Sequence, residues 1–183
     1  MVEFPPRIPF DKEAVMVWDY DISSILYSKG FFGKPLGLRK TKPGYQARPL
    51  VLSPFDALYL HEHNVIKLIS SENKELTDRE IIEQLDSHFE DFSRKYFIYK
   101  YFRNLGYVVR PGMKFGSDFI IYEVGPGFDH SKWVVHVESD SILLKAINVV
   151  RAGRLAASVK KSYLIATIRD DEVHFYGFDR VKI

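Results

Sequence analysis

The chain of 183 residues contains no cysteine. This absence excludes disulfide bonds, cysteine-bound zinc, iron–sulfur clusters and a thiol nucleophile, so any catalysis must use other side chains. No stretch comes near the roughly 18 consecutive apolar residues of a membrane span, and the first residues lack the cationic start and apolar run of a signal peptide. We therefore expect a soluble, cytoplasmic protein with no membrane partner.

The chain also lacks a large excess of charge of one sign. Its formal net charge is +2, which tolerates a polyanionic partner such as a nucleic acid without requiring one. Hydrophobic residues make up 46% of the chain and charged residues 27%, as in ordinary globular proteins. The length allows one large or two small domains.

The first half of the chain mixes short apolar runs with glycine and proline. Runs at 14–18, 22–27 and 64–68 are typical of strands. Ser53-Pro54 predicts the start of a helix, because serine caps free amide groups and proline fits the first turn. Thr77, followed three residues later by Glu80, predicts a second capped helix. We expect these helices to extend to about residues 61 and 88, and a third to span 89–105.

From Gly106 onward, β-branched and aromatic residues dominate and glycine and proline separate them into runs. The expected strands span 107–110, 118–124, 133–138, 162–168 and 173–178. Between the third and fourth strands, a helix is expected from Asp140 or Ser141 to Lys160. The predicted fold class is therefore α+β. A small N-terminal α/β domain of residues 1–95 precedes a C-terminal domain of residues 96–183, in which a long helix packs on a mixed sheet.

Two features of the second half can carry chemistry. Arg154 and Lys161 are seven residues apart, so they lie on one face of the predicted helix and make that face basic. The loop between the second and third strands of this half ends in His130, which follows a Gly-Pro-Gly turn. Each feature alone has a simpler interpretation: a solvated helix face, and an ordinary loop histidine.

The second half resembles a known family. The blocks Gly106-Tyr-Val-Val, Lys114-Phe-Gly-Ser-Asp-Phe and Arg154-Leu-Ala-Ala-Ser-Val-Lys-Lys stand, together with Tyr122 and the dipeptide His130-Ser, in the order and spacing of the catalytic domain of tRNA-intron splicing endonucleases. The resemblance covers residues 100–183. The N-terminal half is compatible with the small α/β domain of the family, and the second half is then its nuclease domain.

The resemblance implies a function and a set of site residues. Tyr122, His130 and Lys161 correspond to the catalytic residues, with Lys160 as the neighbouring alternative for the lysine. Arg154 corresponds to an arginine that holds a base of the RNA bulge. Arg180 stands where many members have a tryptophan that forms the other side of this clamp. The implied reaction needs no metal ion or other cofactor.

The implied substrate is precursor tRNA, cut at bulge–helix–bulge sites by attack of a ribose 2′-hydroxyl on the adjacent phosphorus. The products are a 2′,3′-cyclic phosphate and a 5′-hydroxyl. The resemblance also implies a tetramer, formed either with copies of this chain or with a structural subunit. The second arrangement is preferred because the N-terminal half is divergent. The acidic residues 170–172 correspond either to the charged loop of the family that docks into a neighbouring subunit or to a solvated hairpin tip.

Two other functions remain open at this point. Asp118 and Glu138, on neighbouring predicted strands, are a possible Mg²⁺-binding pair of a metal-dependent nuclease, although Asp140 stands where such enzymes usually carry a lysine. The other possibility is a non-catalytic RNA-binding or structural subunit with the same fold.

Overall fold

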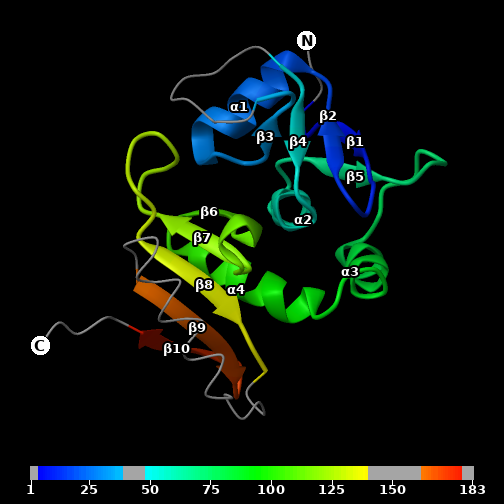
Figure 1. Ribbon diagram of the computed structural model, residues 1–183. Coiled ribbons are helices and arrows are strands. Elements are labelled where there is room, and N and C mark those ends of the chain that lie inside the picture. The colour runs from blue at the N-terminus through cyan, green and yellow to red at the C-terminus, as the bar shows by residue number, and fades with distance from the viewer. Residues whose placement is uncertain (1–3, 39–47, 140–161, 179–183) are drawn as a thin grey trace, which may run out of the picture. The chain divides into compact units, whose positions relative to one another are not determined.

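The structure, a computed structural model, describes residues 4–38, 48–139 and 162–178. The chain divides into two compact units, residues 1–93 and 94–183. Figure 1 shows the elements of both units with their labels. Within the described residues, no helix is both long and apolar enough to cross a membrane.

The first unit contains two small sheets and three helices among its described residues. Strands β1 (Arg7–Pro9) and β5 (Lys67–Ile69) pair in parallel, while β4 (Leu50–Leu52) lies between β2 (Val15–Val17) and β3 (Lys34–Pro35) in an antiparallel sheet. The helices are α1 (Tyr20–Gly30), α2 (Pro54–Glu62) and α3 (Asp78–Asp86). Every second side chain of β2 and β4 points into the core and is completely buried.

One expectation for this unit is wrong. The run at 22–27 is part of helix α1 and not a strand. Asp19 caps this helix, because its carboxylate accepts the N–H groups of Asp21 and Ile22 at 2.9 Å each. Ile22 and Leu26 are buried, four residues apart and on one helix face. Helical spacing and the cap therefore outweigh the strand preference of the isoleucines.

The predicted serine cap at Ser53 and the predicted capping box at Thr77 are both confirmed, and Ser53 also forms a capping box, with Asp56. The Ser53 hydroxyl accepts the N–H of Asp56 at 3.2 Å, and the Asp56 carboxylate accepts the N–H of Ser53 at 3.3 Å. The same carboxylate accepts the N–H of Gly33 at 3.2 Å, so the buried Asp56 ties α2 to the start of β3. Thr77 and Glu80 form the equivalent box at α3.

The second unit consists of one helix and one mixed sheet among its described residues. Helix α4 (Phe92–Asn104) begins three residues later than predicted, after Asp91 with a positive φ of 56°. The strands, each within a few residues of its predicted range, are β6 (Val108–Pro111), β7 (Phe119–Tyr122), β8 (Trp133–Val137), β9 (Ser162–Arg169) and β10 (Glu172–Phe178). A 3₁₀ turn, η1 (Met113–Phe115), connects β6 to β7.

The sheet has the order β10-β9-β8-β7-β6, and only the β8–β9 pair is parallel. The mixed sheet that the sequence predicts is therefore confirmed. The predicted helix from Asp140 or Ser141 to Lys160 lies outside the described residues.

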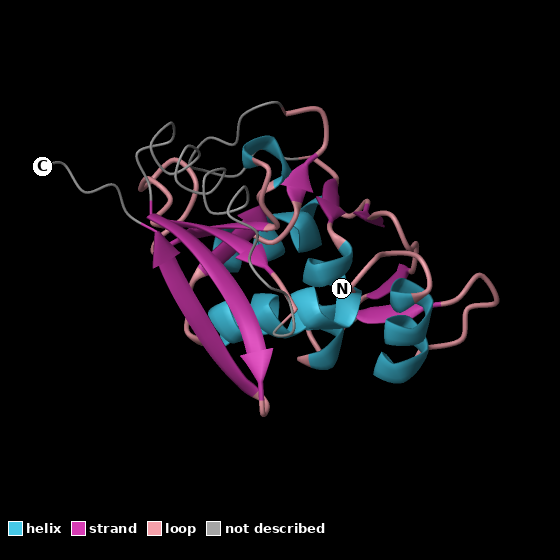
Figure 2. Ribbon diagram, turned by 60° about the horizontal axis from the view of Figure 1, so that its bottom comes forward, coloured by secondary structure: helices cyan, strands magenta, loops and turns pink. Residues whose placement is uncertain are grey.

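Helix α4 covers one face of this sheet. The ring of Phe102 lies 6.2 Å from that of Trp133 and 5.3 Å from that of Phe175, and Tyr99 contacts Phe119 at 6.0 Å between centroids. Figure 2 shows a helix lying across the strands. Arg103, which belongs to α4, is buried. Its guanidinium donates to the Tyr99 hydroxyl at 2.9 Å and to a carbonyl of β6. Aromatic contacts and one buried guanidinium thus fix α4 on the sheet.

The Ser53 cap gives a testable prediction for the first unit. Ser53→Ala removes the hydroxyl that accepts the Asp56 N–H and should lower the free energy of unfolding by about 1 kcal/mol in urea titrations. Ser53→Thr keeps an acceptor at the same place and is the matched control. Equal losses in both variants would show that the cap does not stabilise α2.

Candidate active site

Tyr122 is the last residue of β7 and pairs with Val108 of β6. Its side chain is half-buried. Burial is the main cause that raises the pKa of the Tyr122 phenol above its usual 10, and Asp129 adds to the rise. Arg110 and the Ser131 side chain act in the opposite direction but do not cancel the rise. The phenol is therefore neutral at ordinary pH.

The loop after β7 is closed by one carboxylate. Asp129 accepts the N–H groups of Glu123 at 3.0 Å, Val124 at 3.1 Å and Gly125 at 2.8 Å. We call this set of three hydrogen bonds the amide clip. Burial alone raises the pKa of Asp129, but the N–H donors outweigh burial and leave the pKa below its usual value.

The clip returns the chain to the end of β7. His130, the next residue, is exposed at the loop end. Ser131 is buried and its side chain lowers the pKa of the Tyr122 phenol, while the N–H of Lys132 donates to the carbonyl of Ile121 at 2.7 Å. The structure therefore brings the chain segment that carries His130 to the strand end that carries Tyr122.

The other predicted site residues lie outside the described residues. These are the catalytic candidate Lys161 and the RNA-binding candidates Arg154 and Arg180. Sequence reasoning did not assign a part to Asp129 or Ser131. The signal was an aspartate four residues after a loop glycine, since aspartate side chains often accept nearby backbone N–H groups in turns.

Asp118 and Glu138, the pair considered for a metal ion, belong to a network of charges. The Asp118 carboxylate lies 3.2 Å from Lys95 Nζ and accepts the N–H of Val137 at 2.8 Å. Nδ1 of His136 is 2.8 Å from the same carboxylate, in an ion pair that is not aligned as a hydrogen bond. Nε2 of His136 is 3.0 Å from Glu138 Oε1. An imidazole therefore lies between the two carboxylates.

These contacts shift the acid–base properties of the network. Asp118 raises the pKa of His136, burial opposes the rise, and Glu138 adds to it, so the pKa lies above 6.5. Burial raises the pKa of Asp118, but His136, the Val137 N–H and Lys95 outweigh it and bring the pKa below 3.8. Both oxygens of Asp118 are thus occupied by protein cations and an N–H donor. In the part of the chain that the structure describes, no group of three or more His, Asp or Glu side chains is arranged to hold a metal ion.

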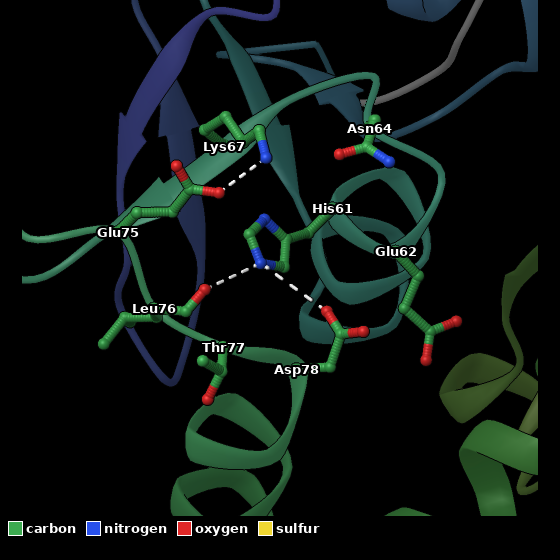
Figure 3. Close-up of a pocket in the computed structure, with 8 residues that line it drawn as sticks. All are labelled: His61, Glu62, Asn64, Lys67, Glu75, Leu76, Thr77 and Asp78. Carbon is green, nitrogen blue, oxygen red and sulfur yellow. Dashed lines mark hydrogen bonds and ion pairs between the residues drawn. The ribbon is translucent and has the colours of Figure 1, made fainter.

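A separate hollow of about 430 Å³ lies in the first unit (Figure 3). His61 lies at its wall and is buried, with Nδ1 accepting the N–H of Leu68 at 3.1 Å and Nε2 2.9 Å from the Leu76 carbonyl. With Nδ1 as acceptor, Nε2 carries the proton and donates to that carbonyl. Lys67 and Glu75, which both line the hollow, form an ion pair with each other. The histidine is therefore a structural link between α2, β5 and the chain before α3, and none of the predicted site residues lines the hollow.

The chain is similar over most of its length to a family of RNA-processing enzymes. The family model described as "tRNA intron endonuclease, catalytic C-terminal domain" matches residues 92–175, and the one described as "tRNA intron endonuclease, N-terminal domain" matches residues 9–82. A tRNA-splicing endonuclease of Pyrobaculum arsenaticum is 39% identical over 175 residues, which cover 93% of this chain and 96% of the relative.

Two other relatives give the same result. A tRNA-splicing endonuclease of Hyperthermus butylicus is 35% identical over 151 residues, with 82% of this chain and 83% of the relative covered. One of Saccharolobus solfataricus is 31% identical over 172 residues, with 92% and 94% covered.

The His136 network predicts a pH-dependent stability. Because the folded pKa of His136 is raised, its stabilising contribution is complete below the unfolded value of about 6.5 and is lost as pH rises through the higher folded value. The urea midpoint of the wild type should therefore fall between pH 6 and alkaline pH by more than that of His136→Gln. His174→Gln is the matched control, because His174 lies in the same sheet and its cross-strand neighbour, Thr167, carries no charge. Parallel pH profiles for the wild type and His136→Gln would contradict the assignment.

Proposed function

The chain belongs to the tRNA intron endonuclease family, and on this premise we propose how its residues cleave introns out of precursor tRNA. It is an enzyme of the tRNA-intron lyase type, with the catalytic domain in its second half. The proposal concerns the residues that act, the chemistry of each step and the assembly that performs it.

In the proposed reaction the 2′-oxygen of the ribose forms a bond to the adjacent phosphorus as the bond from phosphorus to the 5′-oxygen breaks. His130 acts as the general acid and gives a proton to the leaving 5′-oxygen, a task that suits an imidazole near neutral pH. Lys161 stabilises the additional negative charge on the phosphorane. The products are a 2′,3′-cyclic phosphate and a 5′-hydroxyl, and no metal ion takes part.

Tyr122 positions the 2′-hydroxyl in this proposal and does not act as its base. A phenol whose pKa is raised above 10 holds its proton near neutral pH, so it donates or accepts a hydrogen bond but rarely removes a proton. The proton of the 2′-hydroxyl then passes to solvent as the 2′-oxygen attacks. The observation that carries the proposal is the joining of Tyr122 to the His130 segment through Ser131 and the amide clip.

The proposed substrate contacts and assembly rest on the family membership. Arg154 holds a base of the bulge by stacking, with Arg180 as the other half of the clamp. The enzyme works in the cytoplasm as a tetramer, with a structural subunit as the preferred partner and copies of this chain as the alternative. The exposed turn at Asp170 and Asp171, between β9 and β10, is the proposed docking loop.

The metal-independent mechanism is tested by cleavage of an intron-containing precursor tRNA in EDTA, with the chain alone and with a candidate structural subunit. Cleavage should continue, while His130→Ala and Lys161→Ala lower the single-turnover rate at least about a hundredfold with little change in RNA binding. His88→Ala is the matched control for the histidine, and Lys160→Ala shows whether the neighbouring lysine acts in place of Lys161. Loss of cleavage in EDTA would support the metal-dependent alternative, and no cleavage under any condition would support a binding subunit.

The base clamp gives a separate prediction. Stacking of a guanidinium on an extruded base contributes about 1–3 kcal/mol in comparable single-strand complexes. Arg154→Ala should therefore weaken binding to an RNA with the bulge more than binding to a plain duplex, in titrations of the two RNAs. Arg151→Ala is the matched control on the same segment. An equal loss for both RNAs would reduce Arg154 to a general phosphate contact.

A further inference from the structure

The amide clip sets the course of the chain immediately before His130. Oδ2 of Asp129 accepts the N–H groups of Glu123 and Val124, and Oδ1 accepts that of Gly125. The chain reverses direction between Gly125 and Asp129. The N–H groups of residues 128 and 129 donate to the Gly125 carbonyl at 3.0 and 3.2 Å. Gly125 and Gly127 have positive φ angles of 149° and 91°, which favour glycine. The loop is thus closed at its base by one charged side chain.

Ser131 holds the other side of the same segment. The residue is only 5% exposed, and its side chain interacts with the Tyr122 phenol closely enough to lower the pKa of that phenol. The adjacent Lys132 N–H donates to Ile121, the residue before Tyr122, which fixes the backbone of the two segments side by side. His130 therefore stands between two residues that are each tied to the end of β7.

We infer that Asp129 and Ser131 are positioning residues for the cleavage reaction, Asp129 through His130 and Ser131 through Tyr122. Neither has to touch the RNA, because Asp129 uses its oxygens on backbone N–H groups and Ser131 is buried. Asp129 fixes the backbone from which the imidazole extends, and Ser131 fixes the phenol. This inference rests on the proposed function of His130 and Tyr122.

The chemistry of the clip requires a carboxylate. Both oxygens of Asp129 face N–H donors, so an asparagine must turn its own NH₂ group towards at least one of them. A donor facing a donor loses the hydrogen bond and leaves an N–H unsatisfied. The lowered pKa of Asp129 keeps the carboxylate charged throughout the neutral range. Asp129→Asn is therefore a nearly isosteric change that opens the clip.

The decisive measurement is the single-turnover rate of precursor tRNA cleavage at saturating enzyme, together with the dissociation constant for the same RNA. Misplacement of a catalytic group by about 1 Å lowers a rate by up to about a hundredfold, so Asp129→Asn should lower the rate between about ten- and a hundredfold. RNA binding should change less than about twofold, because the lost contact acts only on the placement of the acid. Ser131→Ala should lower the rate in the same way, and Ser131→Thr should restore part of it.

A matched variant and a double variant separate positioning from general damage. Glu123→Gln breaks only the exposed ion pair with Lys132 at the base of the same loop, and it should leave the rate unchanged. In the His130→Ala background, Asp129→Asn should lower the rate no further, because its effect passes through the imidazole. A further loss in that background, or a wild-type rate in both Asp129→Asn and Ser131→Ala, would overturn the inference.

The outcomes also distinguish this inference from the proposed function. If His130→Ala cleaves as fast as the wild type, the proposed general acid is wrong. If His130→Ala is inactive while Asp129→Asn and Ser131→Ala are fully active, only the positioning inference fails. Should Asp129→Asn not fold, as judged by its urea transition, the Ser131→Ala and Ser131→Thr pair decides the question through Tyr122.

Discussion

The carboxylate of Asp129 and its three backbone N–H donors determine the form of the candidate site. Without this contact the N–H groups of residues 123–125 would lose the acceptor that closes the turn from Gly125 to Asp129 at its base. A loop of this kind has many conformations of similar energy, and selecting one of them costs conformational entropy. A charged acceptor that takes up three donors offsets this cost. The end of β7 then becomes a rigid support for the residue that follows the clip.

The second unit uses charge in two different ways. At the start of β7, Asp118 is enclosed by Lys95, His136 and a backbone N–H, an arrangement that holds α4, β7 and β8 together. At the other end of β7, Asp129 accepts hydrogen bonds from backbone N–H groups of the loop, and the next residue, His130, is exposed. The first carboxylate is used for the fold and the second for a loop. This difference argues against the interpretation of Asp118 and Glu138 as an open pair of metal ligands.

Local signals predicted much of the secondary structure. The caps at Ser53 and Thr77 were recognised because each needs only residues three apart, and the strands of the second half were recognised from runs bounded by glycine and proline. Helix α1 was missed, although Asp19 and the spacing of Ile22 and Leu26 indicate a helix. Its β-branched residues favour strands when considered by themselves, and burial on one helix face reversed that preference.

The sequence by itself determined the family and the residue types available for catalysis, because these depend on the order and spacing of short blocks along the chain. Helix caps belong to the same class of information. Only the tertiary structure decided that Asp129 faces three N–H groups, that Ser131 meets Tyr122 and that His136 lies between two carboxylates. Such contacts depend on which strands pair and in which register. Register is set by the burial of whole strand faces and cannot be obtained from any one segment.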